Sequence, residues 1–119
     1  AWEDPAFVDA IRKTGRTKIV MSGITTDVCV AFAALSALDA GFEVYVVTDA
    51  SGSMSEQTQL ASLMRMQDAG AIMGTWFALS CEMLYDWRNP KGQETAQLFV
   101  EHFPAYAEIF YSHAAHSKK

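Results

Sequence analysis

Cysteine and histidine are scarce in this chain, and the few that are present lie far apart. Cys29 and Cys81 are its two cysteines in 119 residues, and they match no zinc-site spacing and are too few for a disulfide framework. His102, His113 and His116 are likewise spaced without the pattern of metal ligands. We therefore expect a reduced, cytoplasmic setting and neither a bound metal nor a cofactor.

Basic residues and long apolar runs are also scarce. Nine Lys and Arg against 14 Asp and Glu leave a net charge of -5, so we do not expect nucleic acid as a partner. No segment approaches the roughly 20 apolar residues of a membrane-spanning helix, so we expect no membrane partner either. Hydrophobic residues make up 50% of the chain and charged residues 19%, which indicates a packed core rather than disorder.

Glycine and proline divide the chain into alternating helices and strands. The apolar spacing predicts helices over 5–14, 26–40, 53–69 and 76–87, strands over 18–21, 42–47 and 71–75, and helical pieces over 94–102 and 105–111. Residues 112–119 are expected to fray. Because strands that alternate with such helices are typical of right-handed crossovers, we predict an α/β fold with three layers, α-β-α, around a parallel Rossmann-like sheet.

The second predicted strand and the helix after it are joined by a short connection. Residues 48–52 are expected to form the turn that follows the strand. Ser53 and Glu56 stand in the spacing of a capping box, which predicts that the helix begins there. The residues of this helix that we expect to face the core are Leu60, Leu63, Met64 and Ala69.

Three strands are few for a parallel sheet, because an edge stays exposed unless another segment pairs with it. The chain also begins Ala-Trp-Glu-Asp-Pro, without an initiating Met. At 119 residues it is long enough for at most one domain. We therefore expect residues 1–119 to be the C-terminal part of a single larger domain whose first strands lie upstream.

Residues 18–30, KIVMSGITTDVCV, combine a short apolar strand, a glycine turn and the start of a helix. In open parallel sheets the ligand crevice lies beyond the carboxyl ends of the strands, which is where Cys29 falls. A thiol in the first turn of a helix lies near the positive end of the helix dipole, and nearby backbone N–H groups could receive an oxyanion. By spacing alone, a buried structural cysteine is the more common alternative.

The residue types in this turn are more specific than its spacing. Residues 22–30, SGITTDVCV, resemble the G-x-x-T-x-x-C-V signature of the isochorismatase-like cysteine hydrolases, which include nicotinamidases and related amidases. The segments TWF at 75–77 and DWRN at 86–89 are similar to the YcaC-type subgroup in particular. The resemblance covers nearly the whole chain.

The resemblance implies a role for each matching position. Cys29 would be the nucleophile that attacks an amide-like C–N bond, or a related bond, of a small molecule and forms a covalent thioester-type intermediate. A non-proline cis peptide would join Ile24 and Thr25, and the backbone N–H groups of Thr25 and Cys29 would form the oxyanion hole. Thr26 matches the threonine of the motif, and helix capping is its simplest role.

Members of the superfamily activate the cysteine with an Asp after the first strand and a Lys after a later strand, both well before the cysteine. Here Asp4 and Asp9 lie in the first predicted helix, and Lys18 opens a strand at the wrong end, so neither partner is found. We therefore expect this chain by itself to be inactive or nearly so. The alternative is a non-catalytic oligomerising or binding module with the same fold.

Three other side chains near the predicted site have simpler explanations. Asp27 and Asp49 follow strands, where carboxylates commonly cap helices or hydrogen-bond in turns. Cys81 lies in an apolar helical run and is expected in the core.

Two further expectations concern the aromatic residues. Trp76 is a candidate for lining a substrate pocket, although aromatic side chains beside helices, such as Trp2 and Phe77, more often fill a core or an interface. The apolar surface of residues 99–111 exceeds what a globule of this size readily hides, so we expect a homo-oligomer.

Overall fold

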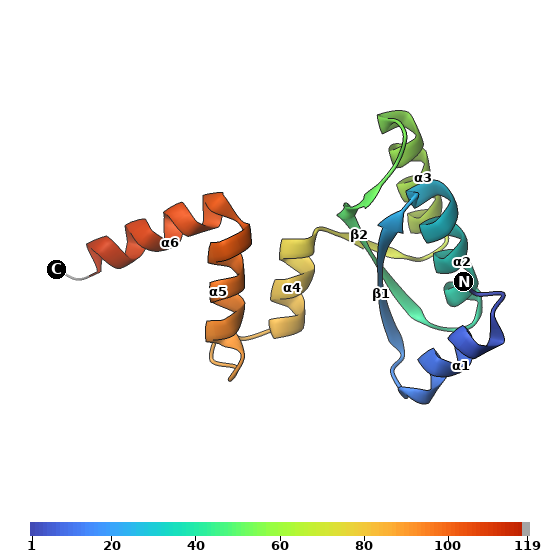
Figure 1. Cartoon of the computed structure of the whole chain (residues 1–119), viewed down its shortest axis with the longest axis horizontal. Helices are drawn as coiled ribbons and strands as arrows, with labels where there is room; N and C mark the ends of the chain where they lie inside the picture. Colours follow the sequence, from blue (N-terminus) through green and yellow to red (C-terminus); the bar gives the residue numbers. More distant parts are fainter. Residues whose placement is uncertain (118–119) are drawn as a thin grey trace. The chain divides into compact units, whose positions relative to one another are not determined.

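The computed structural model describes residues 1–117 and divides into unit 1, Ala1–Trp76, and unit 2, Phe77–Lys119 (Figure 1). Unit 1 contains α1 (Pro5–Lys13), β1 (Lys18–Ile24), the π-helical turn η1 (Thr26–Val30), α2 (Ala31–Asp39), β2 (Glu43–Gly52), α3 (Glu56–Asp68) and β3 (Ile72–Gly74). Helices α4 (Trp76–Leu84), α5 (Gly92–His102) and α6 (Pro104–His116) follow, with Trp76 at the division.

Unit 1 is organised by a parallel sheet in which the strand order is β1-β2-β3. Its strands alternate with helices along the chain, and α2 and α3 lie on the same side of β1 and β2 in Figure 1. This arrangement confirms the predicted α/β fold with a three-stranded parallel sheet flanked by helices. The predicted cap of α1 is also confirmed, since the side chain of Asp4 accepts a hydrogen bond from the Ala6 N–H at 2.9 Å.

The core of unit 1 lies between the sheet and helices α2 and α3. Val44 and Val46, two residues apart on β2, are fully buried and face the helices, as the period of a strand requires. The helix α2 contributes small side chains, Ala34 and Ala37, which are also fully buried and let its backbone approach the sheet closely. Met66 of α3 fills the remaining space with no exposed surface.

The prediction of which residues of α3 face the core is wrong in most positions. Leu60 and Met64 are 61% and 57% exposed, whereas Ser62 and Met66 are buried and Leu63 packs against the core. The predicted capping box at Ser53 and Glu56 is wrong as well. The cap is Ser55, whose hydroxyl accepts from the Thr58 N–H at 3.1 Å and thereby satisfies one free donor of the first turn.

The predicted turn at 48–52 is in fact the second half of β2. The strand runs on to Gly52 because β1 also continues past Met21, and the two extensions pair in a shifted register in which Gly23 faces Ser51 and Ile24 faces Gly52. The shift between Met21 and Gly23 marks a bulge in the ladder. The carboxyl ends of β1 and β2 are therefore held together up to Ile24, two residues before η1 begins.

Unit 2 consists of α4, α5 and α6 around the ring of Phe99, which is fully buried. Phe77 and Tyr106 lie 4.6 Å and 5.4 Å from it between ring centroids. Helix α4 ends at Leu84 rather than at 87, because Tyr85 takes a left-handed conformation with φ of 68° that stops the helix. Helix α6 continues to His116, so the predicted fraying from Ser112 is wrong as far as His116; Lys118 and Lys119 lie outside the described residues.

None of the helices between residues 1 and 117 is both long enough and apolar enough to cross a membrane.

Candidate active site

The candidate site begins where β1 ends. The strand passes through Gly23, which takes a φ of 153° that favours glycine, and the next residues, Ile24 and Thr25, are joined by a cis peptide bond. A Cβ at Gly23 would also stand 3.5 Å from a methyl group of Val30. That is an ordinary contact distance, so the backbone conformation rather than a lack of space favours the motif glycine.

The helix that carries Cys29 opens with a π-helical turn. The Val30 N–H donates to the Thr25 carbonyl at 3.1 Å, a five-residue spacing, before the regular α-helix α2 begins at Ala31. The N–H groups that precede the first such donor, including that of Cys29, have no acceptor within the helix. Short π-helical turns of this kind occur frequently at functional sites, and here the turn places free donors next to the thiol.

Cys29 is solvent-exposed. This placement disagrees with the buried structural cysteine that spacing alone favours. Along residues 1–117, the Cys29 thiol makes neither a hydrogen bond nor an ion pair with another side chain. The thiol is thus accessible, and its immediate surroundings in this chain supply no proton acceptor.

Thr26 is the most unusual polar residue of the site. Its side chain is fully buried, and its Oγ1 has no hydrogen-bond partner among the described residues. The helix-capping role is therefore not observed, and the residue in the N-cap position is Thr25, which makes no side-chain cap bond. Burying a hydroxyl without a hydrogen-bond partner costs on the order of 1–3 kcal/mol of folding free energy. The Thr26 side chain therefore destabilises the fold next to Cys29.

The two carboxylates that follow strands differ in their roles. Asp49 accepts a hydrogen bond from the Trp76 N–H at 2.8 Å, so it acts as a helix-cap carboxylate for α4, as expected. Asp27 is partly buried in the first turn of η1, where its charge suits the positive end of the helix. Its carboxylate forms no hydrogen bond or ion pair within the described part of the chain.

A polar network that the sequence analysis missed supports the end of β2. The side-chain amide of Gln59, on α3, donates to the carbonyls of Thr48 and Ser51 at 3.2 Å and 3.0 Å. Its Oε1 accepts from the Ser53 hydroxyl at 2.5 Å, and the Ser51 hydroxyl donates to the Val47 carbonyl at 2.7 Å. Glutamine in a polar helix gives no sequence signal for this role, because the contact depends on where α3 crosses the strand.

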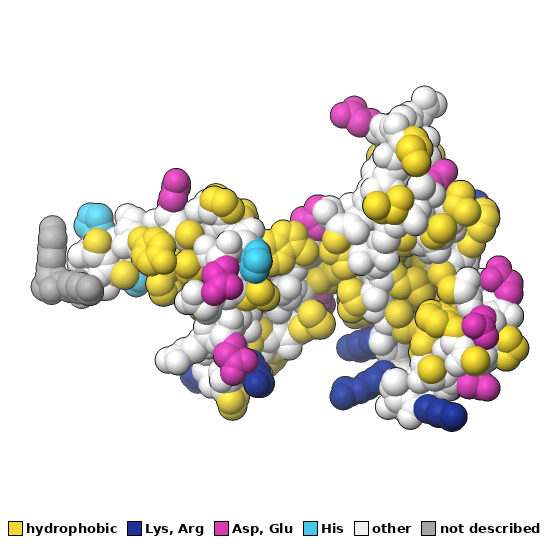
Figure 2. All heavy atoms as spheres, viewed as in Figure 1, with side chains coloured by type: hydrophobic (Ala, Val, Ile, Leu, Met, Phe, Trp, Pro, Cys, Tyr) yellow, Lys and Arg dark blue, Asp and Glu magenta, His cyan; other side chains and the backbone are white. Residues whose placement is uncertain are grey.

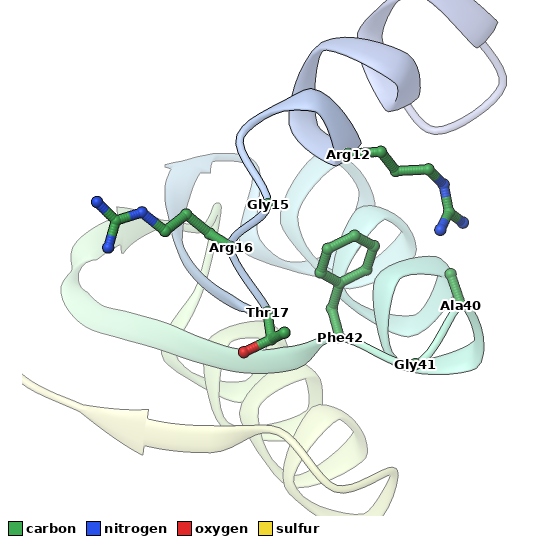
Figure 3. Close-up of a pocket in the computed structure, with 7 residues that line it drawn as sticks. All are labelled: Arg12, Gly15, Arg16, Thr17, Ala40, Gly41 and Phe42. Atoms are coloured by element: carbon green, nitrogen blue, oxygen red, sulfur yellow. The ribbon is translucent and has the colours of Figure 1, made fainter.

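A cavity of about 310 Å³ lies at the opposite end of the sheet from Cys29. It lies among the end of α1, the start of β1 and the loop before β2 (Figure 3). The guanidinium of Arg12 stands 5.6 Å from the centre of the Phe42 ring, while that of Arg16 extends away from the ring in Figure 3. Because β1 has seven residues, this cavity is about 20 Å from the end that leads to Cys29 and belongs to a different surface.

A second cavity, of about 320 Å³, lies between η1 and α3. Asp27 and Ala31 line it from one side and Arg65 from the other. Cys29 is two residues from Asp27, roughly half a helical turn away, so its side chain leaves the helix on the side away from this cavity. Neither cavity is lined by the cysteine. Along the described chain, no cluster of three His, Cys, Asp or Glu side chains could hold a metal ion.

The three aromatic residues considered for the substrate pocket or an interface lie in different parts of the structure. Trp2 packs edge-on against Phe42, at 5.8 Å between ring centroids, and fills the core at the end of the sheet away from Cys29. Phe77 packs within unit 2. Trp76 is partly buried directly after β3, at the same edge of the sheet as Cys29. Cys81 is partly exposed on α4 rather than fully buried in a core.

Known proteins are similar to this chain over the residues of the candidate site. A family model described as the isochorismatase domain matches residues 1–77. The probable hydrolase YcaC of Escherichia coli (strain K12) is 43% identical over 119 residues, which is 100% of this chain and 57% of that protein. The chain thus spans a little more than half the length of this curated relative.

Two solved structures match nearly the whole chain. YcaC from Pseudomonas aeruginosa, with hexane-2,5-diol and covalent acrylamide, has a TM-score of 0.88 at 43% identity and covers 95% of this chain and 55% of its own. The Escherichia coli YcaC structure, an octameric hydrolase of unknown specificity, has a TM-score of 0.88 at 44% identity over 96% of this chain. A pyrazinamidase/nicotinamidase from Streptococcus mutans matches 56% of the chain, at 28% identity and a TM-score of 0.55.

Proposed function

Because the chain belongs to the isochorismatase family, we propose that it carries the nucleophilic cysteine of a hydrolase that acts on an amide-like C–N bond, or a related bond, of a small molecule. The observation that carries this proposal is the placement of Cys29. It is exposed, in the opening turn of a helix, directly beyond the carboxyl end of a parallel strand. In open α/β sheets this is where ligands bind.

The proposed reaction has two steps at Cys29. The Cys29 Sγ attacks the carbonyl carbon, and the N–H groups of Thr25 and Cys29 receive the oxyanion. The C–N bond breaks, the amine leaves with the proton from the thiol, and a thioester with Cys29 remains. Water then attacks the thioester, which releases the carboxylic acid and restores the thiol.

Two relatives support the class of chemistry. The Pseudomonas aeruginosa structure contains covalent acrylamide, an electrophile that reacts readily with thiolates, and it matches this chain at 43% identity. The Streptococcus mutans neighbour is a pyrazinamidase/nicotinamidase, which names an amide C–N bond as a substrate class in this fold.

None of the interactions among the described residues gives the Cys29 thiol a proton acceptor for this reaction. In that part of the chain, the Cys29 thiol has no carboxylate or ammonium partner. General base catalysis contributes about 100-fold to 10,000-fold to such reactions. We therefore propose that residues 1–119 by themselves are inactive or nearly so, and that an Asp and a Lys of a longer protein complete the site.

Trp76 is proposed to line the substrate pocket. It follows β3, two strands from β1, so its backbone lies about 10 Å from the end of the strand that leads to Cys29. This is a distance that a small planar substrate and two side chains can fill. Trp76→Ala would then raise KM more than it lowers kcat in the longer protein.

The experiment that tests the nucleophile compares alkylation rates in folded and unfolded chain. Brief iodoacetamide treatment at about pH 6, followed by mass spectrometry, gives separate rates for Cys29 and Cys81. We expect Cys29 to react faster in the folded chain than in the same chain unfolded in guanidinium, because only folding creates the helix opening. Cys81 is the internal control and should react more slowly when folded, since it is partly buried.

A Cys29 rate in the folded chain equal to or below the unfolded rate would contradict an activated thiol and favour the non-catalytic binding module. Hydrolysis of nicotinamide by the 119-residue chain alone, abolished in Cys29→Ala, would instead contradict the proposed need for further residues.

We also propose that the protein assembles as a homo-oligomer, because a relative that matches 96% of this chain is octameric. Small molecules are the only other partners that we propose.

A further inference from the structure

Basic residues concentrate at the end of unit 1 that lies away from Cys29. Of the nine Lys and Arg in the chain, four lie within residues 12–18, namely Arg12, Lys13, Arg16 and Lys18. No Asp or Glu occurs between Asp9 and Asp27. Figure 2 shows Lys and Arg side chains gathered on this part of unit 1. A chain with a net charge of -5 therefore carries a compact positive surface, which we call the basic cluster.

The basic cluster has no counter-ion within residues 1–117. None of its four side chains forms an ion pair there, whereas the guanidinium of Arg88 pairs with Asp86. Lys18 lies beside Glu43 in the register of β1 and β2, but that carboxylate accepts a hydrogen bond from the Tyr45 hydroxyl instead. Because like charges close together repel, an anion bound among them would relieve the repulsion.

The dipole of α1 accounts for only part of the basic cluster. Arg12 and Lys13 lie in the last turn of α1, where positive charge stabilises the free carbonyl groups of a helix end. Arg16 and Lys18 follow Gly15 and lie beyond the helix, and the dipole effect falls off within the last turn. The second half of the cluster therefore needs another explanation.

The cavity of about 310 Å³ described above lies within the basic cluster. Arg12 and Arg16 both line it, and none of its lining residues is acidic. Its volume is at the lower end of the range of small-molecule sites and equals that of roughly ten water molecules. Hydrogen bonds fix its backbone walls. The Phe42 N–H donates to the Ala37 carbonyl at 3.0 Å, and the Gly15 N–H donates to the Arg12 carbonyl at 3.1 Å.

The two arginines of the cavity have donors available. The guanidinium of Arg12 stands over the Phe42 ring, at 5.6 Å from its centre, and a guanidinium in that position keeps its N–H donors in its own plane. Arg16 lies on the other side of the ring in Figure 3 and extends away from it. Its exposed side chain makes no hydrogen bond or ion pair among residues 1–117, so it can turn toward an anion without breaking a contact.

We propose that this cavity binds a small molecule that carries an oxyanion of the phosphate class, as in a diphosphate or a phosphate ester, and that Arg12 and Arg16 hold the oxyanion. The fork of N–H donors on a guanidinium matches such oxygens in pairs. A carboxylate has one negative charge, whereas a phosphate group has about 1.5–2 at pH 7, which suits a cluster of several cations better. The site is about 20 Å from the end of β1 that leads to Cys29, so it is independent of the chemistry proposed there.

The test titrates pyrophosphate, without magnesium, into the 119-residue chain at low salt and measures the heat of binding. We expect saturable binding, and at least tenfold weaker binding of acetate at the same ionic strength. Arg12→Gln and Arg16→Gln should each weaken pyrophosphate binding at least fivefold. Arg65→Gln is the matched control, because it also removes a guanidinium that stands over a ring, that of Phe32 at 5.9 Å, but one that lines the other cavity. It should change the affinity less than twofold.

Two further measurements locate the oxyanion and define how it is held. Arg12→Lys keeps the charge but removes the fork of donors, so it should still weaken binding at least threefold. In NMR spectra, pyrophosphate should shift the amide signals of Gly15 and Gly41 and leave those of Gly23 and Cys29 unchanged. Far-UV circular dichroism checks that each variant keeps the helix content of the unmodified chain.

Four results would overturn the proposal. The first is the absence of saturable pyrophosphate binding at millimolar concentrations. The second is an affinity for acetate equal to that for pyrophosphate. The third is an equal loss of affinity in Arg65→Gln and Arg12→Gln, which would show a response to net charge alone. The fourth is a set of NMR shifts centred on Cys29, which would place the anion at the candidate active site. Alkylation of Cys29 is measured separately, so the proposed nucleophile can fail or succeed without affecting these readings.

Discussion

The core of unit 1 and the core of unit 2 are built from different kinds of contact. Unit 1 packs aliphatic side chains such as Val44, Val46 and Met66 between a hydrogen-bonded sheet and two helices, and these residues are fully buried. Residues 77–117 of unit 2 form no sheet, and their core depends on aromatic rings around Phe99. A sheet fixes backbone positions through its hydrogen-bonded register, and a reactive site requires such fixed positions. Helices that meet through rings leave apolar surface open, which suits assembly.

The largest expected effect is on the ring that unit 2 depends on. Phe99→Ala removes a fully buried side chain in contact with Phe77 and Tyr106, and should cost about 3–5 kcal/mol of the unfolding free energy of unit 2. Hydrogen exchange in α5 and α6 should accelerate while that of β1 and β2 stays slow. Leu98→Ala, at a residue 44% exposed, is the control and should change little. Equal acceleration in β2 would show that the units unfold together.

The corresponding change in unit 1 is expected to be slightly smaller. Met66→Ala leaves a cavity in the aliphatic core and should cost about 2–4 kcal/mol in urea unfolding. Met64→Ala, on the same helix but 57% exposed, should cost well under half as much. Similar losses for both methionines would mean that α3 does not pack on the sheet through Met66.

A glycine of unit 2 leaves no room for a side chain, whereas a glycine of unit 1 does. A Cβ on Gly92, at the start of α5, would lie 2.3 Å from the backbone oxygen of Trp87, so Gly92→Ala must displace that turn and should cost about 1–3 kcal/mol. The control is Gly15→Ala in unit 1, where a Cβ would meet no atom within 4 Å and the cost comes from its φ of 69° alone. Thermal unfolding of both variants measures the two costs. A silent Gly92→Ala would show that the turn moves freely.

The effect at the candidate active site should have the opposite sign. Thr26→Val replaces a buried hydroxyl that has no partner in residues 1–117 with a methyl group of similar shape. We expect the free energy of unfolding of this chain to rise by about 1 kcal/mol, because the desolvation cost of the hydroxyl disappears. Thr25→Val, next to it but with no cap bond to lose, is the control and should stay near zero. A destabilised Thr26→Val would mean that the hydroxyl is hydrogen-bonded in solution.

The smallest effect is a dependence on pH that is confined to the exposed turn of unit 2. Side-chain hydrogen bonds from Arg88, followed by its backbone N–H, lower the pKa of Asp86. Because the folded pKa lies below the unfolded one, the contribution of this carboxylate to stability is present above about pH 4 and is lost as the pH falls through the folded pKa. NMR titration of Asp86 should show the shift, and Arg88→Ala should remove it. An unshifted Asp86 would contradict the pair.

Local signals predicted much of unit 1 correctly. The Asp4-Pro5 pair predicted the start of α1, and the β-branched run after Lys18 predicted β1. Gly41 follows α2 with φ of 94°, the conformation that glycine adopts most easily at a helix end. These features depend on residues within a few positions of one another, so a single sequence contains all the information they require.

Features that depend on distant contacts were missed. The extension of β2 through Ser51 and Gly52 depends on pairing with Gly23 and Ile24, and local turn signals suggested the opposite. The core face of α3 was misassigned, because Leu60 and Met64 are apolar but point away from the sheet. The polarity of the side chains alone does not show which apolar side of α3 packs against the sheet.

The turn that carries Cys29 shows the same division. The sequence alone predicted a strand, a glycine and a helix that place a cysteine at the carboxyl end of the sheet. It also showed the family motif. All of these features are local in the chain. Only the tertiary structure decided that Cys29 is exposed, that Thr26 is buried without a partner and that Gln59 supports the neighbouring strand. Exposure and hydrogen bonding depend on what packs against a residue, and those neighbours lie far away along the chain.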